Sequence, residues 1–205
     1  MTEEKAQVKT VICTSLNKIR ARVPCEKGWK KLLDHLGKTK ADDEPLPFSV
    51  IVESNGLDDA LWACRTTPEY DHEWRLFAVW CARQVQHLMT YHQSVDALDV
   101  AYRHANGQAT NEELHAAQNA AKDAARDAAR DAYHKSVQDA AWAAAWAAAR
   151  AARYAASAVA EYAGWAARNA AGGVAEYAGW VAWAAAKDAQ TQKFLDVVSS
   201  ARGEK

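Results

Sequence analysis

Tryptophan, tyrosine and arginine side chains recur at helical spacing in the second half of the chain, and they are the residues best suited to bind a ligand. Four of them are spaced by four residues each: Trp142, Trp146, Arg150 and Tyr154. On a helix, this spacing places the side chains in one slowly drifting stripe. Indole rings stack on nucleobases, and guanidinium groups bond to phosphates through two N–H groups. The stripe therefore indicates a nucleotide-type ligand.

A facing helix would turn this stripe into a pocket. Trp165 or Trp180, together with Arg168, would supply a second flat wall with cationic corners. No catalytic residue belongs to this predicted ligand-binding site. Its members are Trp142, Trp146, Arg150, Arg153, Tyr154, Tyr162, Trp165, Arg168 and Trp180.

The same tryptophans could instead be core residues. Large aromatic side chains dominate core burial where aliphatic residues are scarce, and on that ground the core interpretation is favoured over the ligand site. The arginines weaken this interpretation, because a buried arginine needs a partner. Glu161 and Glu176 are candidate partners.

Histidine, cysteine and other residue types common in active sites are present, but they do not form known catalytic or metal-binding motifs. The sequence has no nucleophile elbow, phosphate-binding loop, dinucleotide fingerprint or HExxH motif. The seven histidines are scattered, so we predict no metal site and no cofactor. Cys64 and Cys81 fall on apolar faces and are expected to be core thiols. We therefore predict a protein that is not an enzyme.

Four carboxylates lie close together in the sequence between residues 53 and 73. Helix caps and solvated turns explain such carboxylates better than a general acid–base pair. The four residues are Glu53, Asp58, Asp59 and Glu73.

Alanine sets the architecture that positions these side chains. It fills about half of the positions in 115–189, and proline is absent from that stretch. Alanine is the best helix former but buries little apolar area. The pattern predicts an all-α fold, a multi-helix bundle of antiparallel helices whose alanine-rich C-terminal half packs tightly.

A seven-residue repeat divides this alanine-rich region. The segment 159–165, Val-Ala-Glu-Tyr-Ala-Gly-Trp, recurs at 174–180. Gly172-Gly173 between the copies predicts a break, so that the copies lie on two helices packed against each other. A final helix is expected over 191–198.

Helical periodicity and stop signals also organise the first half. We predict a helix within residues 1–25 that ends before Pro24, and another over 26–36 that Gly37 ends. Residues 38–47 form a charged, proline-containing loop, the best candidate for an internal boundary. The predicted domains are thus an N-terminal extension, 1–44, and a helical domain, 45–200, which could also be one continuous domain.

Residues 48–113 predict a series of short helices. Pro47 begins the first, and Asn55-Gly56 ends it; helices over 57–65 and 69–89 follow. Ser94 is expected to cap a helix that continues to Ala105. Thr110 and Glu113 have the spacing of a capping box, which would begin the alanine-rich region.

Composition limits the classes of partner. The net charge of −1 argues against a protein dedicated to long nucleic acids. Charged residues interrupt the alanine run every few positions, so we predict no membrane span. The four cysteines lack CxxC spacing, and the first residues lack the apolar core of a signal peptide. A cytoplasmic protein is the expectation.

Three stretches resemble a known family. They are 55–65, Asn-Gly-Leu-Asp-Asp-Ala-Leu-Trp-Ala-Cys-Arg; 75–83, Arg-Leu-Phe-Ala-Val-Trp-Cys-Ala-Arg; and 105–114, Ala-Asn-Gly-Gln-Ala-Thr-Asn-Glu-Glu-Leu. With the alanine and tryptophan array that follows, residues 45–200 resemble the alanine-rich immunity proteins of bacterial polymorphic-toxin loci and phages. This resemblance implies a helical, non-catalytic cytosolic protein that binds and neutralises a target. It assigns no binding residue.

These observations lead to one leading function and one rival. The leading function is an immunity or anti-defence protein that either blocks a toxin or defence effector protein or sequesters a small nucleotide signal. The rival is a structural alanine-rich protein without a ligand. Self-association as a homodimer is compatible with both, because alanine faces often complete their burial on a second copy.

Overall fold

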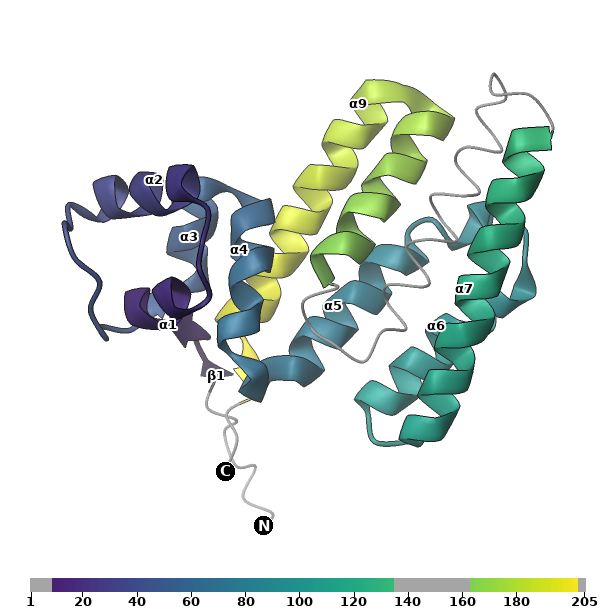
Figure 1. The fold of residues 1–205 in the computed structure, drawn as a ribbon, viewed down its shortest axis with the longest axis horizontal. Helices are drawn as coiled ribbons and strands as arrows, with labels where there is room; N and C mark the ends of the chain where they lie inside the picture. Colours follow the sequence, from purple (N-terminus) through teal and green to yellow (C-terminus); the bar gives the residue numbers. More distant parts are fainter. Residues whose placement is uncertain (1–8, 135–162, 203–205) are drawn as a thin grey trace, which may run out of the picture. The chain divides into compact units, whose positions relative to one another are not determined.

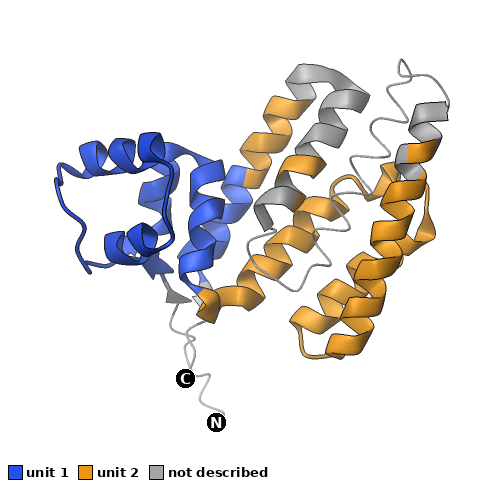
Figure 2. Cartoon of the chain, viewed as in Figure 1, with its two compact units in different colours: residues 1–67, 191–205 blue, residues 68–190 orange. Residues whose placement is uncertain are grey.

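The computed structural model of the chain describes residues 9–134 and 163–202. Within these ranges the side chains of some helical residues, including 131–134 and 171–182, lie outside the description. The chain divides into two compact units, and each is considered by itself (Figure 2). Unit 1 consists of residues 1–67 and 191–205, and unit 2 consists of residues 68–190.

The described residues are mainly helical, as the sequence predicts. Their strands are two-residue segments in two antiparallel pairs: β1 (Lys9–Thr10) with β4 (Ala201–Arg202), and β2 (Cys13–Thr14) with β3 (Leu46–Pro47). The all-α class is therefore confirmed (Figure 1). A search of the described residues finds no helix with the length and apolar character needed to cross a membrane.

Unit 1 contains four short helices, a 3-10 turn and the end of the last helix. The elements are α1 (Leu16–Ala21), α2 (Glu26–Leu36), α3 (Phe48–Asn55), α4 (Leu57–Ala63), η1 (Cys64–Thr66) and the part of α9 (Ala163–Ser199) from Thr191 onward. The core of the unit includes Phe48 and Phe194, whose rings pack edge to face with centroids 6.1 Å apart. This contact joins the C-terminal end of α9 to the N-terminal half of the chain.

Of the helix predicted within residues 1–25, residues 9–15 are not helical, whereas Leu16–Ala21 form α1, which ends before Pro24 as predicted; residues 1–8 lie outside the described residues. Helix begins only at Leu16, where Ser15 Oγ accepts a hydrogen bond from Lys18 N–H at 3.2 Å. Before that, Ile12 N–H donates to Val198 O at 2.8 Å, and Phe48 N–H donates to Ile12 O at 3.3 Å. Backbone groups that pair with distant segments cannot also pair within a helix.

The predicted ends of the next helices are confirmed. α2 ends at Leu36, and Gly37 follows in the left-handed region with φ of +63°. α3 begins directly after Pro47, and Gly56, with φ of +92°, separates it from α4. Glycine adopts positive φ without a steric penalty, and this is why local sequence predicts these stops.

Ion pairs hold the charged loop between α2 and β3. Lys38 Nζ lies 2.6 Å from Asp42 Oδ2 and 2.5 Å from Glu44 Oε2. These hydrogen bonds raise the pKa of Lys38, and the bond to Asp42 has the larger effect. The backbone of Asp42 also accepts from Asn17 N–H at 3.0 Å. Residues 1–44 and 45–67 belong to the same unit.

Unit 2 begins with two 3-10 turns and three longer helices. They are η2 (Pro68–Tyr70), α5 (Asp71–Arg83), η3 (Gln86–Leu88), α6 (His92–Ala105) and α7 (Asn111–His134). Trp74, Phe77, Cys81 and Val85 are buried together in the core of the unit. The helix expected over 69–89 is divided, however, since α5 ends at Arg83 and Leu88 belongs to η3.

Ser94 does not cap α6. The helix begins at His92 after Tyr91, whose backbone is extended, and Ser94 lies in the first turn and is completely buried. The predicted end of this helix at Ala105 is correct, and Gly107 follows with φ of +69°. A serine hydroxyl can cap only from an extended residue outside the helix.

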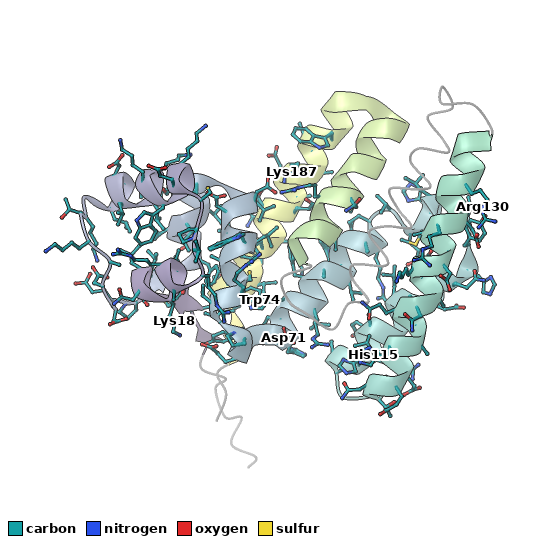
Figure 3. All side chains as sticks on the ribbon, in the orientation of Figure 1. Lys18, Asp71, Trp74, His115, Arg130 and Lys187 are labelled. Atoms are coloured by element: carbon teal, nitrogen blue, oxygen red, sulfur yellow. The ribbon has the colours of Figure 1, made fainter. Side chains whose placement is uncertain are left out.

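The capping box that begins α7 is confirmed in both directions. Thr110 N–H donates to Glu113 Oε2 at 2.7 Å, and Glu113 N–H donates to Thr110 Oγ1 at 3.2 Å. Further along α7, Arg126 pairs with Asp123 at 3.2 Å and Arg130 with Asp127 at 2.5 Å. Figure 3 labels Arg130 on this exposed helix face.

The last helix, α9 (Ala163–Ser199), is continuous where the sequence predicted a break. Helical structure runs through Gly172-Gly173 and on through the separate helix expected over 191–198, although Figure 1 shows that α9 changes direction along its length. Each glycine costs about 1 kcal/mol of helix propensity, and the surrounding alanines offset this cost. The helical assignment therefore does not stop at the glycine pair, although Figure 1 shows the two ends of α9 running in opposite directions.

Candidate functional site

The predicted Trp/Arg site lies mostly outside the described residues. This holds for Trp142, Trp146, Arg150, Arg153, Tyr154 and Tyr162. Trp165 and Trp180 belong to α9, but their side chains are outside the description, and Arg168 is exposed on the same helix. The described part of the chain thus leaves this site as a prediction.

A pocket in unit 1 is the best-defined candidate site among the described residues. It lies among α1, α2, α3 and α4, which Figure 1 shows grouped together, and has a cavity volume of about 80 Å³. This volume is several times what one water molecule requires. The lining consists of Ile19, Pro24, Cys25, Gly28, Trp29, Leu32, Ile51, Asn55, Asp59, Trp62 and Ala63.

One face of α2 forms the largest part of the lining. Cys25, Gly28, Trp29 and Leu32 are spaced by three and four residues, so they lie on the same side of the helix. Cys25 is also the cap of α2, because its Sγ accepts a hydrogen bond from Gly28 N–H at 3.3 Å. Local capping therefore fixes where this face begins.

The polar end of the pocket is held by Asn55, the last residue of α3. Its Nδ2 group donates to Gly28 O at 2.8 Å and to Asp59 Oδ2 at 2.7 Å. Its Oδ1 accepts from Ser54 Oγ at 2.6 Å. One amide thus ties α2, α3 and α4 together and orients the carboxylate of Asp59.

Among the described residues that line this pocket, Asp59 alone is charged. Its Oδ2 accepts the bond from Asn55, and Oδ1 makes no hydrogen bond to any residue that the structure describes. The side chain is half-buried. The pocket therefore presents one oriented acceptor among largely apolar walls.

Gly28 allows α2 to approach this carboxylate closely. A Cβ atom on Gly28 would lie 2.8 Å from Asp59 Oδ2 and 3.1 Å from Cys25 Sγ. Both distances are too short for a carbon atom without movement of its neighbours. The glycine is needed here for space, since an ordinary helix interior favours alanine.

Two half-buried tryptophans, Trp29 and Trp62, form the aromatic part of the walls. The guanidinium carbon of Arg65 lies 4.7 Å from the ring centroid of Trp62, within the range of a cation–π contact. Arg65 Nε also donates to Trp62 O at 2.8 Å. The indole of Trp62 therefore already lies beside one cation.

A second polar arrangement, in unit 2, joins three helices. Arg75 donates to Asp71 Oδ2 on α5, its Nη1 lies 3.1 Å from His104 Nδ1 on α6, and His104 Nε2 lies 2.9 Å from Asn111 Oδ1 on α7. Figure 3 labels Asp71, where this chain of contacts begins. Because arginine only donates, His104 Nδ1 must accept and the proton must be on Nε2. The arrangement fixes helix packing.

The cysteines divide by burial. Cys64 and Cys81 are completely buried, as predicted, and burial raises the pKa of both thiols. Burial also raises the pKa of Cys13, which is half-buried. Cys25 is exposed at the pocket. No three His, Cys, Asp or Glu side chains of the described residues converge as metal ligands.

The sequence did not single out this pocket. It indicates a cap or solvated turn for Asp59 and no functional role for Trp29. One signal was available, namely Gly28 inside an otherwise favourable helix, because an interior glycine often marks a close approach. The chain matches no family model, no curated protein and no solved structure, so no relative assigns the site.

Proposed function

We propose that the chain is a non-catalytic immunity-type protein that neutralises an effector protein by binding it at the pocket of α1–α4. One observation supports this proposal above the others. Asn55, Asp59, Trp62 and Ala63 all line the pocket, and all belong to the stretch 55–65 that resembles the immunity proteins. One of the three stretches that carry the resemblance thus contributes to the wall of the cavity.

The chemistry of the lining supports binding rather than catalysis. Asp59 Oδ2 accepts a hydrogen bond from the amide of Asn55, and this bond fixes the position of the carboxylate. The walls are otherwise apolar and aromatic, the composition typical of binding pockets. Such a pocket suits one side chain of a partner protein.

The size and charge of the pocket favour a protein target over a nucleotide at this site. Pockets for small ligands usually measure roughly 300–1,000 Å³, and this cavity measures about 80 Å³. Phosphate recognition also uses arginine or lysine, whereas the lining contains a carboxylate as its charged group. Sequestration of a nucleotide therefore remains a proposal for the Trp/Arg stripe alone.

Co-expression with neighbouring gene products tests the proposed function. We expect one product of the genes that flank the chain's own gene to arrest growth and the chain to relieve the arrest. Trp29→Ala should abolish this relief, while Arg126→Ala on α7 should retain it, provided that both variants melt as cooperatively as the parent. The effector should regain full activity when the complex is dissociated.

Two results would contradict this function. The first is that no flanking product is relieved by the chain. The second is that the effector stays inactive after separation, since this would indicate covalent modification. Native mass spectrometry with cyclic oligonucleotides and ADP-ribose derivatives tests the nucleotide proposal, because a retained adduct should be lost in Trp146→Ala or Arg150→Ala.

A further inference from the structure

We infer that the pocket of α1–α4 recognises a primary ammonium group on a short aliphatic stem, the chemistry of a lysine side chain. This inference deepens the proposed function and rests on it, because it assumes that the pocket is the binding site. It follows from three properties of the lining, which are its apolar walls, its single oriented carboxylate and its two indoles.

The apolar walls suit an aliphatic stem. Ile19, Leu32, Ile51 and Ala63 come from all four helices, so the stem would meet hydrocarbon on several sides. Burial of each methylene of such a stem contributes about 0.8 kcal/mol. The small cavity excludes a broad, flat ligand and favours a narrow chain.

The carboxylate of Asp59 suits an ammonium head. Asn55 holds Oδ2 at 2.7 Å and fixes the orientation of the group, which leaves Oδ1 as the acceptor without a bond to the described residues. No lysine, arginine or histidine lines the pocket to neutralise this charge. A charge-assisted hydrogen bond to Asp59 would therefore supply specificity for a cation over a neutral group.

The two tryptophans favour a cation for an independent reason. Indole faces attract ammonium and guanidinium groups, and desolvation strengthens this attraction. Trp29 and Trp62 both line the cavity, so a cation beside Asp59 would lie in an aromatic environment.

The source of the ammonium group is a lysine of the effector if the proposed function holds, and a free alkylamine if it does not. Three soluble probes separate these cases. n-Pentylamine represents a free alkylamine, and 1-pentanol is its neutral analogue. Nα-acetyl-lysine methylamide represents a lysine residue flanked by peptide bonds. The indole N–H resonances of Trp29 and Trp62, assigned through Trp29→Phe and Trp62→Phe, report binding to the full chain.

We expect both amines to shift the two indole resonances and to bind at least fivefold more tightly than 1-pentanol. Asp59→Asn should remove this preference while retaining an oxygen that accepts from Asn55. Asp58→Asn is the matched control, because Asp58 is an exposed neighbouring carboxylate outside the lining, and it should keep the preference. If Asp59→Asn does not fold, raising the salt concentration should weaken amine binding to the parent but not alcohol binding.

The remaining outcomes overturn distinct parts of the account. Equal affinity for 1-pentanol and n-pentylamine would overturn the ammonium inference and leave the pocket as a binding site. Binding of n-pentylamine without binding of the lysine derivative would overturn the assignment to a partner lysine. If no probe shifts either resonance, both the inference and the proposed site are wrong.

Discussion

The Asp59 carboxylate occupies the space beside Gly28, and a Cβ atom on that glycine would lie 2.8 Å from Asp59 Oδ2. The contact joins α2 to α4 at the polar end of the pocket. Asn55 bonds to both partners, to Gly28 O and to Asp59 Oδ2, so neither can move without disturbing the other. The stability of the unit and the geometry of the pocket therefore depend on the same close approach.

Gly28→Ala should destabilise the fold although alanine is the better helix former. Helix propensity alone would favour alanine by about 1 kcal/mol, but overpacking typically costs about 1–3 kcal/mol. We expect a net loss of about 1 kcal/mol in the free energy of unfolding, measured by urea denaturation. In an Asp59→Ala background the same change should be stabilising, and a loss of equal size there would show that Asp59 is not the obstacle.

In the neutral form of the His104 imidazole, the proton should be on Nε2. Nδ1 accepts from Arg75 and Nε2 donates to Asn111 Oδ1, so the imidazole ¹⁵N chemical shifts should report this tautomer. His104→Ala should lower the free energy of unfolding by about 1 kcal/mol through the lost bonds. His115→Ala, at an exposed position of α7, is the control and should change little. A proton on Nδ1 would contradict this geometry.

Val23→Asn should stabilise the chain. Val23 has φ of +54° and is 84 % exposed, so a β-branched residue lies in the left-handed region without compensating burial. Asparagine tolerates this region better, and the relieved strain corresponds to about 1 kcal/mol. Val11→Asn provides the control, because Val11 is also exposed but lacks positive φ. Equal effects on the melting temperature at both positions would refute the role of strain.

The buried thiols should make the fold less stable at alkaline pH. Burial raises the pKa of Cys64 and Cys81 above the ordinary value near 8.5, so the unfolded chain loses protons that the folded chain retains. The stability is complete below that value, and above it each thiol lowers the free energy of unfolding by about 1.4 kcal/mol per pH unit. Between pH 9 and 10 the free energy of unfolding of the Cys64→Ala/Cys81→Ala variant should therefore decline less steeply than that of the parent, because the two chains differ in no other titratable group. Parallel declines would show that these thiols do not contribute.

Local signals in the sequence predicted much of the described fold. Gly37, Gly56 and the Thr110–Glu113 capping box all act within four residues of their own position, so periodicity and turn chemistry were sufficient to locate them. The strands at Lys9–Thr10 and Cys13–Thr14 were missed, because their partners are residues 201–202 and 46–47. A pairing across such separations leaves no local pattern.

The candidate site was harder to predict than the fold. The pocket combines Gly28, Asn55 and Asp59, which lie on three helices, and each has an ordinary local explanation as a helix residue or cap. What makes them a site is the approach of α2 to α4, and this depends on the absence of a side chain. The predicted Trp/Arg stripe, by contrast, was easy to recognise in the sequence, but it lies mostly outside the described residues.

The rate at which N-ethylmaleimide labels Cys25 tests most directly whether the pocket is a binding site. Cys25 is exposed and lines the pocket, whereas Cys64 and Cys81 are buried. Labelling in cells that produce the chain, compared with labelling of the purified protein, should show Cys25 protected several-fold. A reference cysteine at exposed Lys40 (Lys40→Cys), outside the lining, should react equally in both. If Cys25 and the reference react alike in cells, the pocket is unoccupied there, and the proposal that the chain acts through it is wrong.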